Sequence, residues 1–403
     1  MPPPEQQPGR AVLVVCEIPF WREETGAHQR IARLCRALDR AGFRPAVFYA
    51  TRLTAEDRRR LRAGFSGLDV AHPSWPLLLL RRLRRTLGLF RRAASPGAQP
   101  LAWERRWALR RWCRAHRPRF VLVEYLWSAY LAEGLRAAVP QPPLLLLDTI
   151  DVMHLRGARF AERGMDGAPE ISRVEEAAVL SRFDALLAIQ EEEAKELRAM
   201  CPGTPVITVG HALDARPPQS KPAPPVRVFF LGGGGAHNQA AITGFLDSVW
   251  PPVRAAHGPE AELHIAGLVC DTLDAAALPE GVVLRGFVRD LDALYAEAHI
   301  VVNPVHAGSG LKVKNVEALC HAVPLVTTPT GAEGLETGAD AAFLVCRTPE
   351  DMAAELDRLI CGAEVRNALA NAAWQFARDH LGEPAAYGAL LEFLCAHQNT
   401  SGA

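Results

Sequence analysis

Short, almost wholly apolar runs recur along the chain, and a turn and then a helical pattern follow each of them. In the first half these runs are Ala11–Cys16, 45–50, 120–124, 144–147, 185–189 and 206–209. In the second half they are Val226–Leu231, 263–267, Val282–Gly286 and Ile300–Asn303. Runs without polar alternation are typical of parallel strands covered on both faces, and strands that alternate with helices indicate βα units. The sequence therefore predicts two α/β halves, each a doubly wound, Rossmann-like parallel sheet.

A proline-rich segment separates the two halves. It reads Pro217-Pro-Gln-Ser-Lys-Pro-Ala-Pro-Pro225, a proline density that supports neither a helix nor a central strand. We therefore predict a first domain at 1–213, a linker at 214–225 and a second domain at 226–380. Further helices are expected at Pro349–Cys361, Ala363–His380 and 384–397, and residues 399–403 are expected to be disordered.

The composition describes an ordinary globular protein rather than a polyelectrolyte. Hydrophobic residues make up 49% of the 403 positions, charged residues 22%, and the formal net charge is zero, which gives no argument for nucleic acid. The nine cysteines are scattered without metal-ligand spacing, so we expect core thiols in a reducing compartment. No apolar signal core and no run near about 18 apolar residues is present. A cytoplasmic location is expected.

Residues 75–119 are basic and aromatic. Arginines from Arg81 to Arg114 alternate there with Trp103, Trp107 and Trp112. One interpretation is an amphipathic surface that contacts anionic lipid, which would place the protein at the inner face of a membrane. The other is a pair of solvated helices that pack their Leu and Trp faces inward. The block contains no recognisable RNA-binding module.

A glycine-rich turn in the second half joins the strand Ile300–Asn303 to a helix. It reads Gly308-Ser309-Gly310-Leu311-Lys312-Val-Lys314, with Glu317 one turn later. Backbone amides at such a helix start bind phosphate. Only four of the 45 basic residues are lysine, and two of them are here, where a compact ammonium suits a phosphate differently from a guanidinium fork. A phosphate-binding loop is predicted.

Two other features mark the edges of the predicted sheets. Four glycines, 232–235, precede a helix that carries Asn238, and they would let the backbone approach a ligand, although hinges and tight turns use glycine too. In the first half, polar or glycine positions follow successive strands and should converge on one crevice. These positions are Gly26, Glu124, Tyr125, Asp148, Asp151, His154 and Gln190. His154 is open to two interpretations, a hydrogen-bonded structural histidine or a functional group.

Several of these stretches, in order, resemble the GT4-type GT-B glycosyltransferases, the glycosyl transferases of group 1. The resemblance covers Gly308 to Leu319, Val323-Pro-Leu-Val-Thr-Thr and Gly331-Ala-Glu-Gly-Leu335. Polysaccharide-biosynthesis members are similar at Asp148-Thr-Ile-Asp151-Val, Phe183-Asp-Ala-Leu-Leu-Ala-Ile-Gln190, Asn238 with Trp250-Pro, and Gly286-Phe-Val-Arg-Asp290. Because the matches keep their order from about residue 12 to residue 335, together they are more specific than any one motif.

The resemblance implies two Rossmann-like domains that face each other across a cleft. It implies a transferase that takes a sugar from a nucleotide-diphosphate donor, without a metal or another cofactor and usually with retention. The donor would bind the second domain, and a glycan, lipid-linked or small-molecule acceptor would bind the first. Residues 381–403 would cross back onto the first domain.

Carried over by position, the motif assigns a role to each residue type. Glu317 would accept hydrogen bonds from the ribose diol, and Lys312 or Lys314 would neutralise the leaving diphosphate. Candidate catalytic residues are Lys312, Glu317, His154 and Asp151. Candidate donor contacts are Gly26, Asn238, Val288, Arg289, Gly308, Ser309, Gly310, Leu311 and Lys314. Candidate acceptor contacts are Glu124, Tyr125 and Gln190.

The chain departs from the pattern at three places. Ser309 stands where related chains often carry a glutamate, eight residues before Glu317, and the 232–238 turn lacks the usual Arg and Lys pair. Ile150 replaces the histidine that usually precedes Asp151, a role that His154 is a candidate to cover. Asp290-Leu-Asp292 has the form of a metal-binding DxD, but we interpret it as a helix cap.

The same scaffold admits two other functions. A nucleotide-sugar epimerase would convert its substrate without an acceptor, and a non-catalytic partner subunit would keep the fold with a decayed site. Ser309 favours the decayed site, whereas Glu317 and the lysines argue against it.

Overall fold

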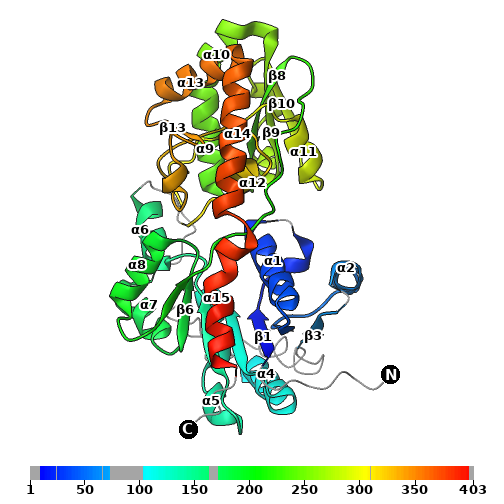
Figure 1. The fold of residues 1–403 in the computed structure, drawn as a ribbon, viewed down its shortest axis with the longest axis vertical. Coiled ribbons are helices and arrows are strands. Elements are labelled where there is room, and N and C mark those ends of the chain that lie inside the picture. Colours follow the sequence, from blue (N-terminus) through cyan, green and yellow to red (C-terminus); the bar gives the residue numbers. More distant parts are fainter. Residues whose placement is uncertain are drawn as a thin grey trace. The chain divides into compact units, whose positions relative to one another are not determined.

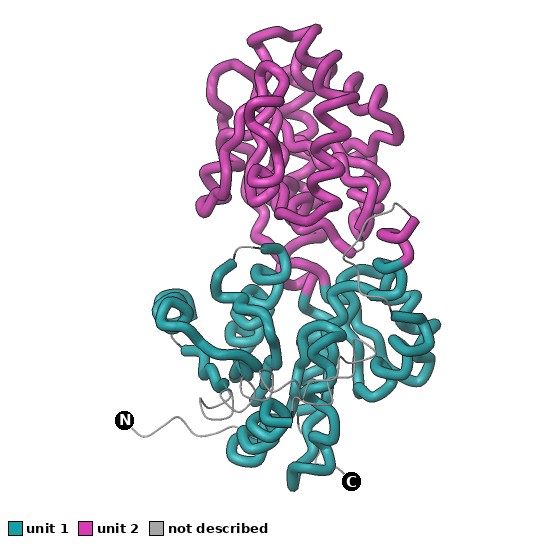
Figure 2. The backbone as a smooth tube through the Cα atoms, turned by 180° about the vertical axis from the view of Figure 1, so that it is seen from behind, with its two compact units in different colours: residues 1–157, 169–209, 387–403 teal, residues 158–168, 210–386 magenta. Residues whose placement is uncertain are grey.

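The computed structural model describes residues 10–23, 25–65, 67–72, 103–162, 171–308 and 310–398. The chain divides into two compact units (Figure 2). The first comprises 1–157, 169–209 and 387–403, and the second comprises 158–168 and 210–386. The Pro-rich segment thus belongs to the second unit, and the chain's final residues belong to the first.

The sheet of the first unit contains seven strands among the described residues, and every neighbouring pair is parallel. Its order is β3-β2-β1-β4-β5-β6-β7. The strands are β1 (Ala11–Cys16), β2 (Arg44–Tyr49), β3 (Asp69–Ala71), β4 (Phe120–Glu124), β5 (Leu144–Asp148), β6 (Ala185–Ala188) and β7 (Val206–Thr208). The apolar runs predicted as strands are confirmed, while β3 was not predicted.

Helices flank this sheet (Figure 1). They are α1 (Gly26–Arg40), α2 (Ala55–Gly64), α4 (Trp103–His116), α5 (Leu135–Ala138), α7 (Arg173–Leu180), α8 (Glu191–Met200), the start of α6 (Met153–Ala161) and most of α15 (Glu383–His397). Thr25 caps α1 by accepting a hydrogen bond from the His28 amide, and α1 buries Ile31, Leu34 and Leu38 against the sheet.

The second unit repeats the architecture with six parallel strands in its described part. Its order is β10-β9-β8-β11-β12-β13. The strands are β8 (Val226–Leu231), β9 (Ala261–Ala266), β10 (Val282–Gly286), β11 (Ile300–Asn303), β12 (Leu325–Thr327) and β13 (Leu344–Val345). Its core packs apolar residues of β8, β9 and β11 against helices on the sheet's faces, with Trp250 and Phe245 wholly buried.

The described α-helices of the second unit lie between or after its strands. They are α9 (Ala236–Ser248), α10 (Trp250–His257), α11 (Leu291–Glu297), α12 (Val313–Cys320), α13 (Pro349–Cys361) and α14 (Ala363–His380). Short 3-10 turns complete the chain at η1 (Phe20–Arg22), η2 (Leu126–Ala132), η3 (Gly258–Glu260), η4 (Leu268–Thr272), η5 (Ala275–Ala277) and η6 (Glu336–Gly338).

Both strand orders reverse direction at one point, between β1 and β4 in the first sheet and between β8 and β11 in the second. In open parallel sheets, ligands bind at the carboxyl ends of the strands on either side of this switch point. The glycine run 232–235 leaves β8, and the loop with Gly308 and Gly310 leaves β11. The two glycine-rich segments therefore meet at the ligand edge of the second unit.

The Pro-rich segment contains no helix or strand, as predicted, and it is held against the second unit. The Arg216 amide donates to the Cys320 carbonyl at the end of α12, at 2.7 Å. Lys221 donates to the Tyr295 carbonyl in α11 at 2.9 Å, and burial lowers the pKa of Lys221 to about 8. The segment is thus anchored beside α11 and α12.

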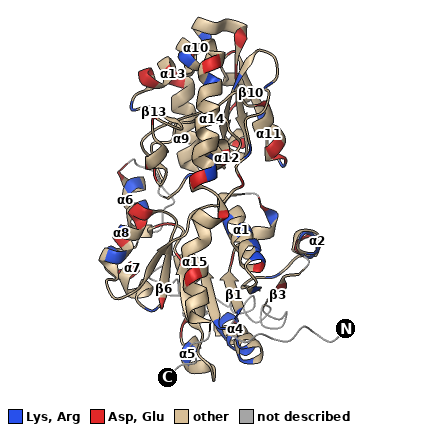
Figure 3. Cartoon of the chain, in the orientation of Figure 1, with Lys and Arg blue, Asp and Glu red and all other residues tan. Residues whose placement is uncertain are grey.

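Where it is described, the basic block differs from the inward-packing interpretation at Trp103 and Trp107, and contact with anionic lipid stays a prediction. Blue segments mark the Lys and Arg positions of α4 (Figure 3), and Arg105, Arg110 and Arg114 donate hydrogen bonds to Tyr130 and to the Glu133 and Ala138 carbonyls. Leu109 is buried, whereas Trp103 and Trp107 are 39% and 46% exposed. Most arginines of α4 therefore fasten the helix, and its two exposed tryptophans face away from the core. Residues 73–102 lie outside the described residues.

The remaining compositional predictions concern thiols and membrane spans. All nine cysteines are free thiols, and seven of them are buried, which confirms the expected core thiols. No helix in the described part of the chain is both long and apolar enough to span a bilayer. The predicted disorder of residues 399–403 falls outside the described residues.

Candidate donor site

The loop between β11 and α12 has a backbone shape that requires glycine. Gly308 has a φ of 119° and Gly310 a φ of 72°, conformations that side chains with a Cβ rarely adopt. No side chain caps the start of α12 at Lys312, so the amides of its first turn are not bonded by a capping side chain. This is the arrangement that phosphate-binding loops use. Ser309 lies outside the described residues.

A buried polar network that the sequence did not reveal holds this loop. The Asn315 side chain, in α12, accepts a hydrogen bond from the Asn303 side-chain nitrogen at 2.8 Å and donates to the Gly331 carbonyl at 2.7 Å. The Thr327 hydroxyl donates to the Asn303 carbonyl at 2.8 Å. A Cβ at Gly331 would lie 1.9 Å from the Thr327 hydroxyl, so only glycine fits there. The network joins the end of β11, α12 and the turn after β12 into one rigid frame.

Lys314 and Asn238 are brought together. The Lys314 ammonium donates to the Asn238 side-chain oxygen at 2.7 Å and lies 4.7 Å from the centre of the Phe230 ring. Burial, and then the charge of Lys312, lower the pKa of Lys314 to about 7. A bound anion would therefore stabilise the charged form of Lys314, because the surrounding protein supplies little negative charge.

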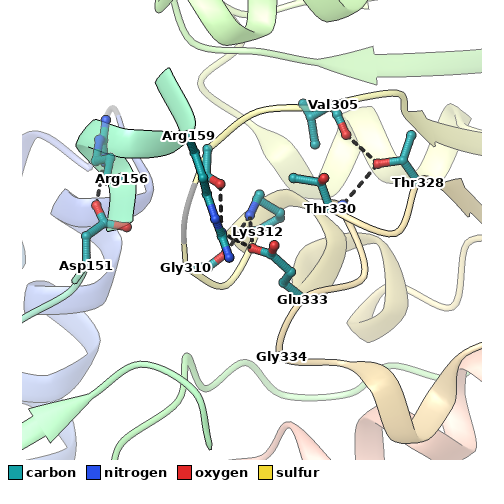
Figure 4. A network of polar contacts seen from close by, with 12 residues as sticks. Asp151, Arg156, Arg159, Val305, Gly310, Lys312, Thr328, Thr330, Glu333 and Gly334 are labelled. Atoms are coloured by element: carbon teal, nitrogen blue, oxygen red, sulfur yellow. Dashed lines mark hydrogen bonds and ion pairs between the residues drawn. The ribbon is translucent and has the colours of Figure 1, made fainter. Parts of the chain in front are cut away.

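Lys312 is in a different environment. It donates to the Gly310 carbonyl at 2.6 Å, and its ammonium lies 3.4 Å from the Glu333 carboxylate (Figure 4). The same carboxylate oxygen accepts a hydrogen bond from Arg159 at 3.0 Å. Arg159, which lies within the residues of the second unit, also donates to the Gly308 carbonyl at 3.1 Å. The sequence predicted Lys312 but neither Arg159 nor Glu333, which are distant from it along the chain.

Glu317 lies in α12 and is buried. Its Oε2 atom accepts a hydrogen bond from the Tyr295 hydroxyl at 3.1 Å, and the Tyr295 ring stacks on His321 with 4.6 Å between ring centres. Burial and the charge of Glu317 raise the pKa of Tyr295 well above its usual value, so this hydroxyl remains a donor. Tyr295 thus fixes the orientation of the Glu317 carboxylate.

Two further predicted donor contacts, Val288 and Arg289, lie at the same edge of the second sheet, beside residues that were not predicted as contacts. Gly267 has a φ of 94°, and a Cβ there would lie 2.3 Å from the Gly232 carbonyl oxygen, which shows how closely the backbones approach. Val288 is half-buried and Arg289 exposed, both in the turn after β10. Asp290 caps α11 by accepting from the Ala293 amide at 3.0 Å, so the capping interpretation of this residue is confirmed.

In the first unit, predicted polar residues also lie at the ends of strands. Asp148, at the end of β5, forms a buried two-point ion pair with Arg30 of α1, at 2.8 and 3.0 Å. Glu124, at the end of β4, is 1% exposed, and neither of its carboxylate oxygens has a hydrogen-bond partner within the described chain. Burial and then the charge of Asp148 raise the pKa of Glu124 well above its usual range. Sequence reasoning missed Arg30, because nothing marks one arginine of an amphipathic helix as buried.

The other first-unit candidates have contrasting environments. The Gln190 side-chain oxygen is buried without a hydrogen-bond partner among described atoms, and Tyr125 stacks on Trp127 at 4.0 Å between ring centres. Gly26 opens α1 and is half-buried. Asp151 pairs with Arg156 (Figure 4).

His154 is clamped between two carboxylates. Its Nδ1 atom lies 2.8 Å from Glu176 and its Nε2 atom 3.5 Å from Glu196. Glu176 also accepts from the Met153 and His154 amides at the start of α6. This environment favours the structural interpretation of the histidine.

Ile150, which stands where the resemblance expects a histidine, has a φ of 60°. A positive φ is a genuine outlier for a β-branched residue and costs about 1–3 kcal/mol. Tyr125, at the end of the adjacent strand, has a φ of 70°. The edge of the first sheet is therefore strained at two neighbouring strand ends.

Among the described residues, one group of side chains could hold a metal ion. His257, at the end of α10, and Asp357 and Cys361 of α13 place their ligand atoms within 4.8 Å of one another. Asp357 and Cys361 are exposed, and none of the three belongs to the glycine-rich loop. The group is therefore separate from the residues of the candidate donor site.

Residues 225–361 match a family model described as glycosyl transferases group 1. Sucrose-phosphate synthase from Thermosynechococcus elongatus is 13% identical with a TM-score of 0.70, over 96% of this chain and 99% of that one. Anabaena HepE, in complex with UDP and glucose, is 13% identical with a TM-score of 0.67, over 96% and 100%. A TarM variant from S. aureus, in complex with fondaparinux, α-GlcNAc-glycerol and UDP, is 8% identical with a TM-score of 0.68, over 97% and 100%. The fold is GT-B. No curated protein sequence gives a significant match.

The match and the geometry concern the same part of this GT-B chain. The matched stretch contains the glycine-rich loop, Lys314, Glu317 and Asn238, all within the second unit. The first unit lies outside that match and is related to the GT-B structures by its fold. The second unit therefore carries the more specific likeness.

Proposed function

We propose that the protein is a glycosyltransferase that moves a sugar from a nucleoside-diphosphate donor to an acceptor. One observation carries the proposal: at the switch point of the second sheet, a glycine-rich loop stands beside Lys314 and Glu317 within the stretch that matches glycosyl transferases group 1. The donor binds the second unit and the acceptor binds the first. The protein acts as a GT4-type enzyme.

Each donor-site residue has a distinct task in this reaction. The loop amides hold the diphosphate, and Glu317, oriented by Tyr295, accepts hydrogen bonds from the ribose hydroxyls. The bond between the anomeric carbon and the phosphate oxygen breaks while a bond to an acceptor hydroxyl oxygen forms, and the proton of that hydroxyl passes to the leaving diphosphate. Lys314 neutralises the negative charge that develops on the leaving diphosphate, with Lys312 nearby. The configuration of the anomeric carbon is retained.

The nucleotide is best tested first as uridine diphosphate. HepE and TarM, which share the fold, are named with UDP in their structures. The acceptor is a glycan or a lipid-linked glycan of a polysaccharide or glycoconjugate pathway. The exposed Trp103 and Trp107, with Arg111 over the Trp107 ring at 5.6 Å, provide a contact for an anionic membrane at its cytoplasmic face.

The decisive experiment measures whether donor turnover depends on an acceptor. The purified protein is first screened against UDP, GDP and ADP and their sugars by thermal shift, because a bound ligand stabilises the native state. Release of the nucleoside diphosphate is then measured with and without lipid-linked and free glycans. We expect release to rise steeply with one acceptor. Conversion of the nucleotide sugar to an epimer without acceptor would establish the epimerase instead, and binding without any turnover would establish a partner subunit.

The reaction proceeds without a metal ion. Turnover is therefore expected to persist in EDTA, and the His257→Ala variant is a useful control because it removes the one metal-compatible group in the described chain. Complete loss in EDTA that Mn²⁺ or Mg²⁺ restores in both proteins would contradict the metal-free mechanism.

A further inference from the structure

Glu333 is an acid placed against a loop that is built for an anion. It follows β12, and its carboxylate approaches the glycine-rich loop through the two cations that it shares (Figure 4). Arg159 joins it to the Gly308 carbonyl, and Lys312 joins it to the Gly310 carbonyl. The side chain remains 23% exposed, so a ligand can reach it.

A carboxylate beside a diphosphate is unfavourable unless its charge is balanced and the ligand offers hydrogen-bond donors. The balance is present, because Arg159 and Lys312 both contact Glu333 Oε2. A nucleotide sugar supplies the donors, since the hydroxyl-bearing sugar is attached directly to the diphosphate. A carboxylate accepts hydrogen bonds from hydroxyls with the strength of a charged acceptor.

The two lysines of the loop, Lys314 and Lys312, have different partners. Lys314 donates to the neutral Asn238 side chain, whereas the ammonium of Lys312 lies 3.4 Å from the Glu333 carboxylate. The loop therefore has one lysine that is bonded to a neutral side chain and a second lysine that lies beside a carboxylate. Two functions for one loop match a ligand with an anionic part and a neutral polyhydroxyl part.

We propose that Glu333 is the residue of the donor site that binds the sugar hydroxyls, and that Arg159 and Lys312 position its carboxylate. This inference rests on the proposed function, because it assumes that the diphosphate lies on the loop. It makes Glu333 a determinant of which sugar is accepted. Arg159 acts through Glu333 and is a positioning residue.

The test separates binding of the nucleotide from binding of the sugar. Calorimetry compares the nucleoside diphosphate and the nucleotide sugar that the wild type binds in the screen of UDP, GDP, ADP and their sugars. Glu333→Gln should weaken binding of the nucleotide sugar about tenfold to a hundredfold, the range for lost hydrogen bonds to a charged group. Binding of the nucleoside diphosphate should stay within about twofold.

A matched control is the neighbouring Glu336. It is exposed, begins η6 and accepts from the Gly334 amide at 2.8 Å. Glu336→Gln should leave both affinities unchanged. Arg159→Ala should weaken the nucleotide sugar selectively, and should add little in the Glu333→Gln background, because a positioning residue acts only through its partner. Melting curves check that each variant is folded.

Three results for the variants, and one for the wild type, would overturn the inference. Equal weakening of both ligands in Glu333→Gln would make Glu333 a support of the loop, and no change in either ligand would remove it from the site. Additive effects of Arg159→Ala and Glu333→Gln would refute the positioning role. A wild-type protein that binds no nucleotide and no nucleotide sugar in the screen would instead refute the proposed function, and the inference with it.

Discussion

The carboxyl edges of the two parallel sheets have the same topology, but they differ in whether their buried polar side chains have hydrogen-bond partners. At the edge of the second sheet, Lys314 is bonded to Asn238 and Glu317 to Tyr295. At the edge of the first, Glu124 and Gln190 bury side-chain oxygens that have no partner in the described chain. The second edge is preorganised, and the first carries unmet hydrogen-bonding capacity.

Strain follows the same division. Positive φ angles around the second unit's loop fall on Gly308 and Gly310, where they cost little. At the first edge they fall on Tyr125 and Ile150, where they cost about 1–3 kcal/mol each. In the proposed function, a rigid edge suits the donor, because every nucleoside-diphosphate sugar presents the same diphosphate group. Unsatisfied and strained groups lower stability and are retained where function requires them.

Among the predicted effects, the largest is expected on turnover, from a substitution of Lys314 at the edge of the second sheet. Lys314→Ala should lower kcat by about a hundredfold or more, because in the proposed mechanism it removes a charge that acts on the leaving diphosphate. Steady-state turnover of the donor measures this. The matched substitution Lys195→Ala, at an exposed lysine of α8, should leave kcat unchanged. Full turnover in Lys314→Ala would remove this residue from the mechanism.

Glu317 should have the next largest effect, and on binding rather than on chemistry. Glu317→Ala should weaken the nucleoside diphosphate about tenfold to a hundredfold in calorimetry, because ribose hydroxyls lose a charged acceptor. Tyr295→Phe should have a smaller effect, since it removes only the group that orients the carboxylate. An unchanged affinity in Glu317→Ala would place the ribose elsewhere.

The fold could be predicted because its information is local. A buried parallel strand is apolar at every position, and so Ala11–Cys16, Val226–Leu231 and Ile300–Asn303 are matched residue for residue. The strand β3 was missed because Asp69–Ala71 is short and half exposed, and α2 because its pattern is mostly polar. The family match to residues 225–361 agrees with the resemblance read from the sequence there.

The candidate donor site could be predicted only where its residues are adjacent along the chain. Lys312, Lys314 and Glu317 share one turn and one helix. Arg159, Tyr295 and Glu333 reach the same loop from other segments, and a single sequence does not show that they meet. Contacts between residues that are distant along the chain therefore became known only from the structure.

The affinity for the nucleoside diphosphate should depend on pH through Lys314, at the edge of the second sheet. The pKa of Lys314 is lowered to about 7, by burial first and then by Lys312, and a bound diphosphate raises it again. Binding therefore takes up a proton above pH 7, and affinity for the nucleoside diphosphate should fall by up to about tenfold per pH unit as pH rises from 7 to 9. Calorimetry across this range checks the slope. Lys314→Arg, whose side chain stays charged, should flatten it, and an equal slope in that variant would assign the proton to another group.

The smallest effect is expected at the first edge, on stability. The folded pKa of Glu124 is raised by burial and then by Asp148, so between the unfolded pKa of about 4.3 and neutrality the unfolded chain binds fewer protons than the folded one. Stability contributed at this site therefore falls as pH rises. Glu124→Gln should match the wild type near pH 4 and be more stable at pH 7.

Each kcal/mol of that gain should raise the melting temperature by about 2–4 °C. Glu192→Gln, at an exposed position of α8, should show no such pH-dependent gain, because surface ion pairs contribute little. A Glu124→Gln variant that is no more stable at pH 7 would mean that Glu124 is satisfied in solution, and the contrast between the two edges would then rest on Tyr125 and Ile150 alone. A variant that is more stable but turns over donor more slowly would show that the first edge keeps its unfavourable carboxyl group for the acceptor.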